Sequence, residues 1–85
     1  MRVVHHKKER YDLYIGRPSL FGNPFVIGRD GTRLEVIAKF EEYARSNLMD
    51  EIRQLKEGTI LGCWCSPLPC HGNVIIKLWK EIHNK

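Results

Sequence analysis

The sequence predicts a small α/β domain, a layered sheet with about three helices, and three observations support this. Short runs of β-branched and aromatic residues alternate with longer stretches of helical periodicity. The last apolar run, residues 59–64, has the continuous hydrophobicity of a strand buried on both faces, which is typical of parallel sheets. A helical pattern follows it, so the C-terminal end has the strand-loop-helix order of Rossmann-like folds.

Two short strands and a shaped loop are predicted in the first third of the chain. Residues 2–5 and 11–15 are rich in β-branched and aromatic residues, and Gly16 ends the second run. Residues 16–25 contain two glycines, two prolines and an asparagine, which indicates a loop. Its apolar side chains are expected to fold back onto the body of the protein. Residues 25–27 are predicted to form a third short strand.

Helices are predicted in the middle and at the end of the chain. Residues 32–35 match a capping box, with Thr32 at the cap and Glu35 three positions later, and they open an amphipathic helix. Residues 46–47 are expected to break that helix, and a shorter one then ends at Gly58, a usual place for a C-cap glycine. In the last helix the apolar residues recur at the spacing of one helix face, namely Ile75, Leu78, Trp79 and Ile82.

Length and composition limit the class of protein. A chain of 85 residues forms one domain, residues 1–85, with a core so thin that a metal, an oligomer or unusually good packing would help it. The 42% hydrophobic and 28% charged residues are ordinary for a globular protein. No apolar run approaches the ~20 residues of a membrane span, and no signal-peptide pattern is present. A cytoplasmic protein with reduced thiols and no membrane partner is expected.

Positive charge gathers near the N-terminus. The formal net charge is +4, which is basic without being extreme. Such a segment can contact the phosphates of a nucleotide or nucleic acid, or it can be a solvated edge that keeps a small protein soluble. Both interpretations stay open. The basic and imidazole side chains of this segment are Arg2, His5, His6, Lys7, Lys8 and Arg10.

Most of the reactive side chains lie in residues 60–74, which run from the last strand to the start of the last helix. All three cysteines are there, and a histidine follows the third. The start of a helix offers unpaired backbone N–H groups and the positive end of the helix dipole, which favour anions. Gly72 would let the backbone approach a ligand closely. We therefore expect this Cys/His-containing loop, with Cys70, His71 and Gly72, to bind a phosphate-bearing ligand, either a nucleotide or a nucleic acid.

Other residues complete the candidate ligand-binding set. Arg17 follows a strand end and a glycine, from which a guanidinium can bind an oxyanion through two hydrogen bonds. Trp64 is more typical of a core residue, but beside the loop it is the better of the two tryptophans for stacking on a ligand. Asn23, which precedes Pro24, is at least as well explained as a turn residue. Asn73 follows Gly72 at the same helix start.

Zinc binding is the first alternative. Cys63, Cys65, Cys70 and His71 are four ligand-type residues within nine positions, and tetrahedral zinc takes four nitrogen or sulfur ligands. The spacing lacks the C-x-x-C pair of common zinc sites, and adjacent Cys70 and His71 project in different directions from a helix. A site of three ligands completed by an N-terminal histidine or water is the other arrangement. Such a structural zinc protein would act by binding a host protein or a second copy of itself.

A third interpretation is an enzyme that processes a nucleoside or nucleotide. A thiol at a helix N-terminus beside an imidazole has two of the factors that lower a thiol pKa, which makes Cys70 a candidate nucleophile. No complete set of nucleophile, base and orienting group can be named from the sequence. Whether the protein is an enzyme is therefore left open. Buried cysteines also serve simply as small apolar residues.

Two groups of residues form a recognisable pattern. They are Tyr14-Ile15-Gly16-Arg17-Pro18-Ser19 with Gly22-Asn23-Pro24-Phe25, and Gly62-Cys63-Trp64-Cys65 with Pro67 and Pro69-Cys70-His71-Gly72. Together they resemble a family of small bacterial and phage proteins known as a domain of unknown function. The resemblance spans roughly residues 12–80 and implies no particular activity. The family pattern has an aspartate after His-Gly where this chain has Asn73, so no mechanism that needs a carboxylate there carries over.

The C-terminal strand-loop-helix unit has a second, weaker likeness. It is similar to nucleotide-binding Rossmann-like proteins such as the lysine-decarboxylase-like and DNA-processing A families. This is a likeness of fold alone, and it supports nucleotide binding only as a hypothesis.

Overall fold

A three-stranded parallel sheet forms the centre of the computed structural model, which describes residues 1–65 and 68–84. Strand β1 (Arg2–His5) and strand β2 (Leu13–Tyr14) both pair with β3 (Ile60–Cys63), so the order across the sheet is β1-β3-β2. Residues 61–63 of the central strand are buried. The parallel pairing and the buried last strand confirm the predicted α/β class.

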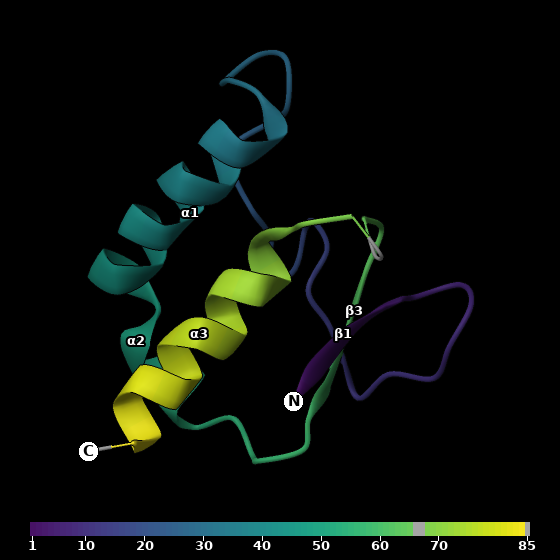
Figure 1. The fold of residues 1–85 in the computed structure, drawn as a ribbon, viewed down its shortest axis with the longest axis vertical. Helices are drawn as coiled ribbons and strands as arrows, with labels where there is room; N and C mark the ends of the chain where they lie inside the picture. Colours follow the sequence, from purple (N-terminus) through teal and green to yellow (C-terminus); the bar gives the residue numbers. More distant parts are fainter. Residues whose placement is uncertain (66–67, 85) are drawn as a thin grey trace.

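The helices pack on one side of these strands (Figure 1). Helix α1 (Arg33–Asn47) begins at the predicted capping box, and helix α2 (Met49–Arg53) follows it after one residue. Helix α3 (His71–His83) follows β3 through a short loop and lies beside α1, running in roughly the same direction (Figure 1). The first turns of α1 and α3 consequently lie toward the same end of the molecule. None of the described helices is long and apolar enough to cross a membrane.

The hydrophobic core lies between the sheet and these helices. Phe40 and Ala44 of α1 and Leu78 of α3 are fully buried, and Leu61 meets them from the central strand. In the loop after β2, Phe21 is buried as expected, whereas Leu20 is 60% exposed. The loop therefore folds back onto the body of the protein through only part of its apolar side chains.

Residues 25–27 do not form the predicted third strand. Val26 donates its N–H to the Asp30 carboxylate, and Gly28 donates its N–H to the Gly31 carbonyl. Ile27 makes only an isolated bridge with Gly31. The hydrogen-bonding groups of this segment are satisfied within one turn, so the β-prone composition does not lead to strand pairing.

Two predicted boundaries also differ. Helix α2 ends at Arg53, five residues before Gly58, whose positive φ of 86° lies in the turn that leads to β3. The second strand contains only residues 13–14 of the predicted 11–15. Asp12 precedes the strand, and its carboxylate accepts the N–H of Ile60 at the start of β3.

Candidate functional site

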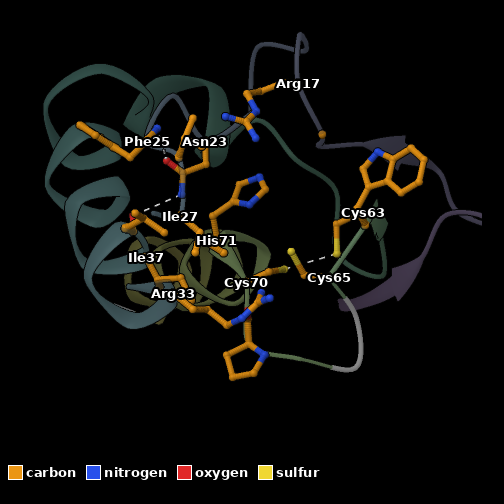
Figure 2. A pocket seen from close by; sticks show the side chains of 15 residues that line it. Arg17, Asn23, Phe25, Ile27, Arg33, Ile37, Cys63, Cys65, Cys70 and His71 are labelled. Carbon is orange, nitrogen blue, oxygen red and sulfur yellow. Dashed lines mark hydrogen bonds between the residues drawn. The ribbon is translucent and has the colours of Figure 1, made fainter. Parts of the chain in front are cut away.

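A pocket of about 400 Å³ lies at the carboxyl ends of β2 and β3. Ligands of open parallel sheets bind at this edge, because the loops that leave the strands meet there. The pocket receives Arg17 from the loop after β2, Arg33 from the first turn of α1, and His71 from the first turn of α3. Figure 2 shows the two arginines on opposite sides of the pocket with the imidazole between them. The other lining residues are Gly16, Asn23, Phe25, Val26, Ile27, Val36, Ile37, Cys63, Trp64, Cys65, Pro69 and Cys70.

The pocket carries positive charge without a compensating carboxylate. The described residues that line it include no aspartate or glutamate. Arg33 donates from Nη1 to the Pro69 carbonyl at 3.2 Å, and Arg17 has no hydrogen-bond or ion-pair partner in the described part of the chain. Four other arginines, in contrast, bind a carboxylate at 2.9–3.3 Å, namely Arg2, Arg29, Arg45 and Arg53. The two pocket guanidinium groups are therefore available to an anion from outside.

His71 is a fixed, neutral wall of the pocket. Its Nε2 lies 2.8 Å from the carbonyl oxygen of Ile15, and since a carbonyl only accepts, Nε2 carries the proton. Burial lowers the pKa of His71, the charge of Arg17 lowers it further, and the carbonyls of Ile15 and Phe21 oppose this. The ring also meets Phe40 edge-on, with the ring centroids 4.9 Å apart. His71 therefore joins α3 to the end of β2 and adds no charge of its own at neutral pH.

Cys70 caps helix α3. Its Sγ accepts the N–H of Gly72 at 3.3 Å, and Asn73 Oδ1 accepts the N–H of Cys70 at 3.0 Å, which completes a capping box with unusual residues. Cys63 Sγ lies 3.4 Å from Cys70 Sγ (Figure 2). The hydrogen bond with Cys63, together with burial, raises the pKa of Cys70. Cys70 is accordingly a protonated thiol, which is the opposite of an activated nucleophile.

The structure brings the four candidate metal ligands only partly together. Among residues 1–65 and 68–84, no three histidine, cysteine, aspartate or glutamate side chains form a group that could hold a metal ion. The sulfur atoms of Cys63 and Cys70 are in contact, and half-buried Cys65 lines the same pocket. The Nε2 atom of His71 is occupied by the Ile15 carbonyl.

Asn23 holds the loop that carries Arg17. Its Oδ1 accepts the N–H of Phe25 at 2.9 Å, as expected of a turn residue, and its Nδ2 donates to the carbonyl of Val36 at 3.2 Å. The side chain therefore ties the loop after β2 to helix α1. Asn23 lines the pocket, but its amide groups serve the protein's own backbone.

Gly72 and Asn73 lie outside the pocket lining. A Cβ at Gly72 would lie 2.8 Å from Ile15 Cδ1 and 2.8 Å from Val3 Cγ2, so the absence of a side chain here lets α3 approach the sheet closely. Asn73 is exposed and caps the helix. Trp64, expected in the core, is 55% exposed and borders the pocket, where its Nε1 donates to the Tyr14 hydroxyl.

Sequence reasoning missed Arg33. This residue is the first of α1, where the positive end of the helix dipole disfavours a cation. An arginine inside the Thr32–Glu35 capping box does not stabilise the helix, so its occurrence there indicates a role outside the helix. The apolar side of the pocket was not predicted either, because Phe25 and Ile27 were expected in a strand.

Comparison with known proteins gives a family but no activity. The family model "Domain of unknown function (DUF4326)" matches residues 2–81. A relative from Enterobacteria phage T4, described as an uncharacterized 12.4 kDa protein in the nrdA-td intergenic region, is 36% identical over 87 aligned positions. That alignment covers 87% of this chain and 72% of the relative. No solved structure matches the chain. Because the family model spans nearly the whole sequence, the chain belongs to the DUF4326 family, which includes small phage proteins as the sequence resemblance implied.

Proposed function

We propose that this protein binds a phosphate-bearing ligand of nucleotide size in the pocket at the carboxyl ends of β2 and β3. One observation carries the proposal: Arg17 and Arg33 line one pocket, and none of the other residues that the structure describes around it is a carboxylate. A guanidinium group matches the oxygens of a phosphate with two parallel hydrogen bonds, and such charge-assisted bonds are the strong ones.

The rest of the pocket supports the same ligand class. Its volume of about 400 Å³ falls in the range of small-molecule sites. The first turn of α3 points the positive end of its dipole toward this edge of the sheet. Phe25, Ile27 and Ile37 form an apolar side of the pocket against which a base or another flat group can pack. A ligand with one anionic and one apolar part fits both sides.

The direct test is thermal unfolding with a panel of nucleoside mono-, di- and triphosphates, their parent nucleosides and inorganic phosphate. A ligand at 100 times its dissociation constant adds about 2.7 kcal/mol to the free energy of unfolding. For a domain of this size, that raises the melting temperature by roughly 10–20 °C. Nucleotides are expected to stabilise the protein and nucleosides are not. A panel in which no phosphate-bearing compound shifts the melting temperature contradicts the proposal.

Arginine variants locate the site. Arg17→Ala and Arg33→Ala should each weaken binding of the best nucleotide by about 10- to 150-fold, since a hydrogen bond to a charged group contributes about 1.5–3 kcal/mol. Arg53→Ala is the matched control, because it removes the same charge from α2, outside the pocket. Equal affinities in all three variants would place the ligand elsewhere.

Zinc binding is the second candidate, and one observation favours it: the sulfur atoms of Cys63 and Cys70 lie 3.4 Å apart and Cys65 lines the same pocket. A structural zinc ion would contribute directly to folding, so a chelator should lower the melting temperature by many degrees. Elemental analysis of protein purified without a histidine tag decides between the candidates. One zinc per chain supports this role, and a metal-free protein with three titratable thiols removes it.

A catalytic role would need a reactive group in this pocket. The raised pKa of Cys70 and the lowered pKa of His71 leave a neutral thiol and a neutral imidazole there. Binding, rather than thiol chemistry on a nucleotide, is therefore the function that we propose.

A further inference from the structure

The face of the sheet away from the helices is covered by aromatic side chains. Val4 and Tyr14 lie opposite Gly62 in the strand register, so their side chains share one face. A Cβ at Gly62 would lie 2.6 Å from Cγ of Tyr11, which shows that the Tyr11 ring lies flat over the glycine on this face. No helix covers it in the described structure, and the segment between β1 and β2 projects on this side (Figure 1).

Two more rings extend this layer toward the carboxyl edge. Trp64 follows Gly62 by two positions, and its ring meets that of His6 at 4.1 Å between centroids. The Trp64 indole N–H donates to the Tyr14 hydroxyl, and the Tyr14 and Tyr11 ring centroids lie 6.3 Å apart. Tyr11 and Trp64 remain 41% and 55% exposed. The layer, which we call the aromatic face, consists of His6, Tyr11, Tyr14 and Trp64.

Cations without a carboxylate partner among the described residues border the aromatic face. Lys7, Lys8 and Arg10 are exposed and have no carboxylate partner among the described residues. Lys7 Nζ lies 4.7 Å from the centroid of a Trp64 ring. The acids of this segment are occupied otherwise: Glu9 pairs with Arg2 at 3.3 Å, and the Asp12 carboxylate accepts the N–H of Ile60. The charge that faces solvent beside the aromatic face is therefore positive.

We infer that the aromatic face is a binding surface for single-stranded nucleic acid. Bases stack on exposed aromatic rings and phosphates pair with neighbouring cations, and this combination is how sequence-tolerant single-strand binders work. The bases of a duplex are stacked on one another and cannot stack on the exposed rings. A duplex would therefore bind only through the cations, and weakly. Exposed Tyr11 and Trp64 supply the stacking positions, and Lys7, Lys8 and Arg10 supply the phosphate contacts.

This inference does not rest on the nucleotide pocket. The pocket lies at the carboxyl edge with Arg17 and Arg33, and the aromatic face lies over Gly62 on the side of the sheet away from the helices. Trp64 alone belongs to both. The two sites can therefore be removed separately.

The test is fluorescence anisotropy with a labelled 12-nucleotide single strand of DNA or RNA and the corresponding duplex, over a series of salt concentrations. The single strand should bind more tightly than the duplex. In the triple variant Lys7→Gln/Lys8→Gln/Arg10→Gln, the slope of log affinity against log salt should become less negative by about 2, since each phosphate contact on a single strand contributes about −0.7. A control triple variant at Lys56, Lys77 and Lys80 removes the same charge from other surfaces, together with the ion pair of Lys77 with Glu41, and should leave the slope unchanged.

Stacking is tested at Trp64. Trp64→Ala should weaken binding of the single strand roughly 5- to 150-fold, whereas Trp64→Phe should retain most of it. Since Trp64→Ala also loses a contact with Tyr14, its melting temperature is measured in parallel, and Tyr11→Ser provides a second stacking variant. Equal binding of strand and duplex, or undiminished binding in the basic triple variant and both stacking variants, overturns the inference. Arg17→Ala should keep its affinity for the strand, and the basic triple variant should keep its response to nucleotides.

Discussion

Replacing Gly72 by alanine should destabilise the fold without touching the pocket. Gly72 lies in the first turn of α3, where that helix crosses the ends of the strands. The added methyl group would lie 2.8 Å from Ile15 Cδ1 and 2.8 Å from Val3 Cγ2. Carbon atoms in a well-packed core are separated by about 3.5–4.0 Å. Helix and sheet would have to move apart, or both branched side chains would have to leave their positions.

The expected cost follows from similar substitutions in packed cores. Overpacking of this kind typically costs about 1–3 kcal/mol. Alanine fits a helix better than glycine by up to about 1 kcal/mol, which offsets part of the cost. A net loss of about 1–2 kcal/mol is expected, which lowers the melting temperature of a domain of this size by roughly 4–16 °C.

Urea unfolding followed by circular dichroism measures this loss, and a double-mutant cycle assigns its cause. A Val3→Ala background removes one of the two close contacts and leaves the one with Ile15, so Gly72→Ala should cost measurably less there than in the wild type. The reasoning is refuted if Gly72→Ala leaves stability unchanged, or if its cost is the same in both backgrounds. Lost nucleotide binding at unchanged stability would show that Gly72 faces the ligand.

Three further outcomes are expected. The free energy of unfolding should fall as the pH decreases from 7 to 5. The pKa of His71 is lowered in the folded protein, so below about pH 6.5 the unfolded chain binds a proton that the folded chain does not. Urea unfolding midpoints measure this dependence on pH, and His71→Gln should flatten it. Asn23→Ala should cost about 1–3 kcal/mol, since it leaves a partly buried backbone N–H without its acceptor; a wild-type melting temperature would contradict the role given to this side chain. Maleimide labelling followed by mass spectrometry should modify half-buried Cys65 well before Cys63 and Cys70, which are 1% and 3% exposed; fast modification of Cys70 would restore the nucleophile hypothesis.

The features that could be predicted from the sequence are those with local causes. The capping box at Thr32 and Glu35 forms both of its hydrogen bonds, because they involve residues only three apart. The buried strand that ends at the first of the three cysteines was recognisable because its continuous apolar run is typical of strands buried on both faces. The helix after them follows from apolar spacing alone.

The features that could not be predicted depend on partners distant in sequence. Residues 25–27 have strand-like composition, but the N–H of Val26 donates to the Asp30 carboxylate and is therefore not available for pairing with a strand. Trp64 is exposed on the face of the sheet away from the helices, where its indole N–H donates to the hydroxyl of Tyr14, fifty residues earlier in the chain. Arg33 enters the pocket because α1 and α3 begin at the same end of the molecule, which no local pattern reveals.

The cysteine motif is explained largely by structure. Gly62 makes room for the Tyr11 ring, and Cys63 packs against Cys70, which caps α3. His71 bonds to the carbonyl of Ile15. Each of these contacts fastens the start of α3 to the carboxyl edge of the sheet, so a ligand is not needed to account for them.

Arg17 is different. It is exposed, it has no hydrogen-bond or ion-pair partner in the described structure, and Asn23 fixes the loop that carries it onto α1. The charge of Arg17 contributes little to folding, because an exposed guanidinium without an ion-pair partner has little Coulomb energy to lose, and the described lining of its pocket has no carboxylate. Truncating Arg17 should consequently leave the melting temperature of the unliganded protein unchanged, whereas the same change at Cys63 or His71 should lower it. The residue that folding does not explain is thus the one on which ligand binding should depend most.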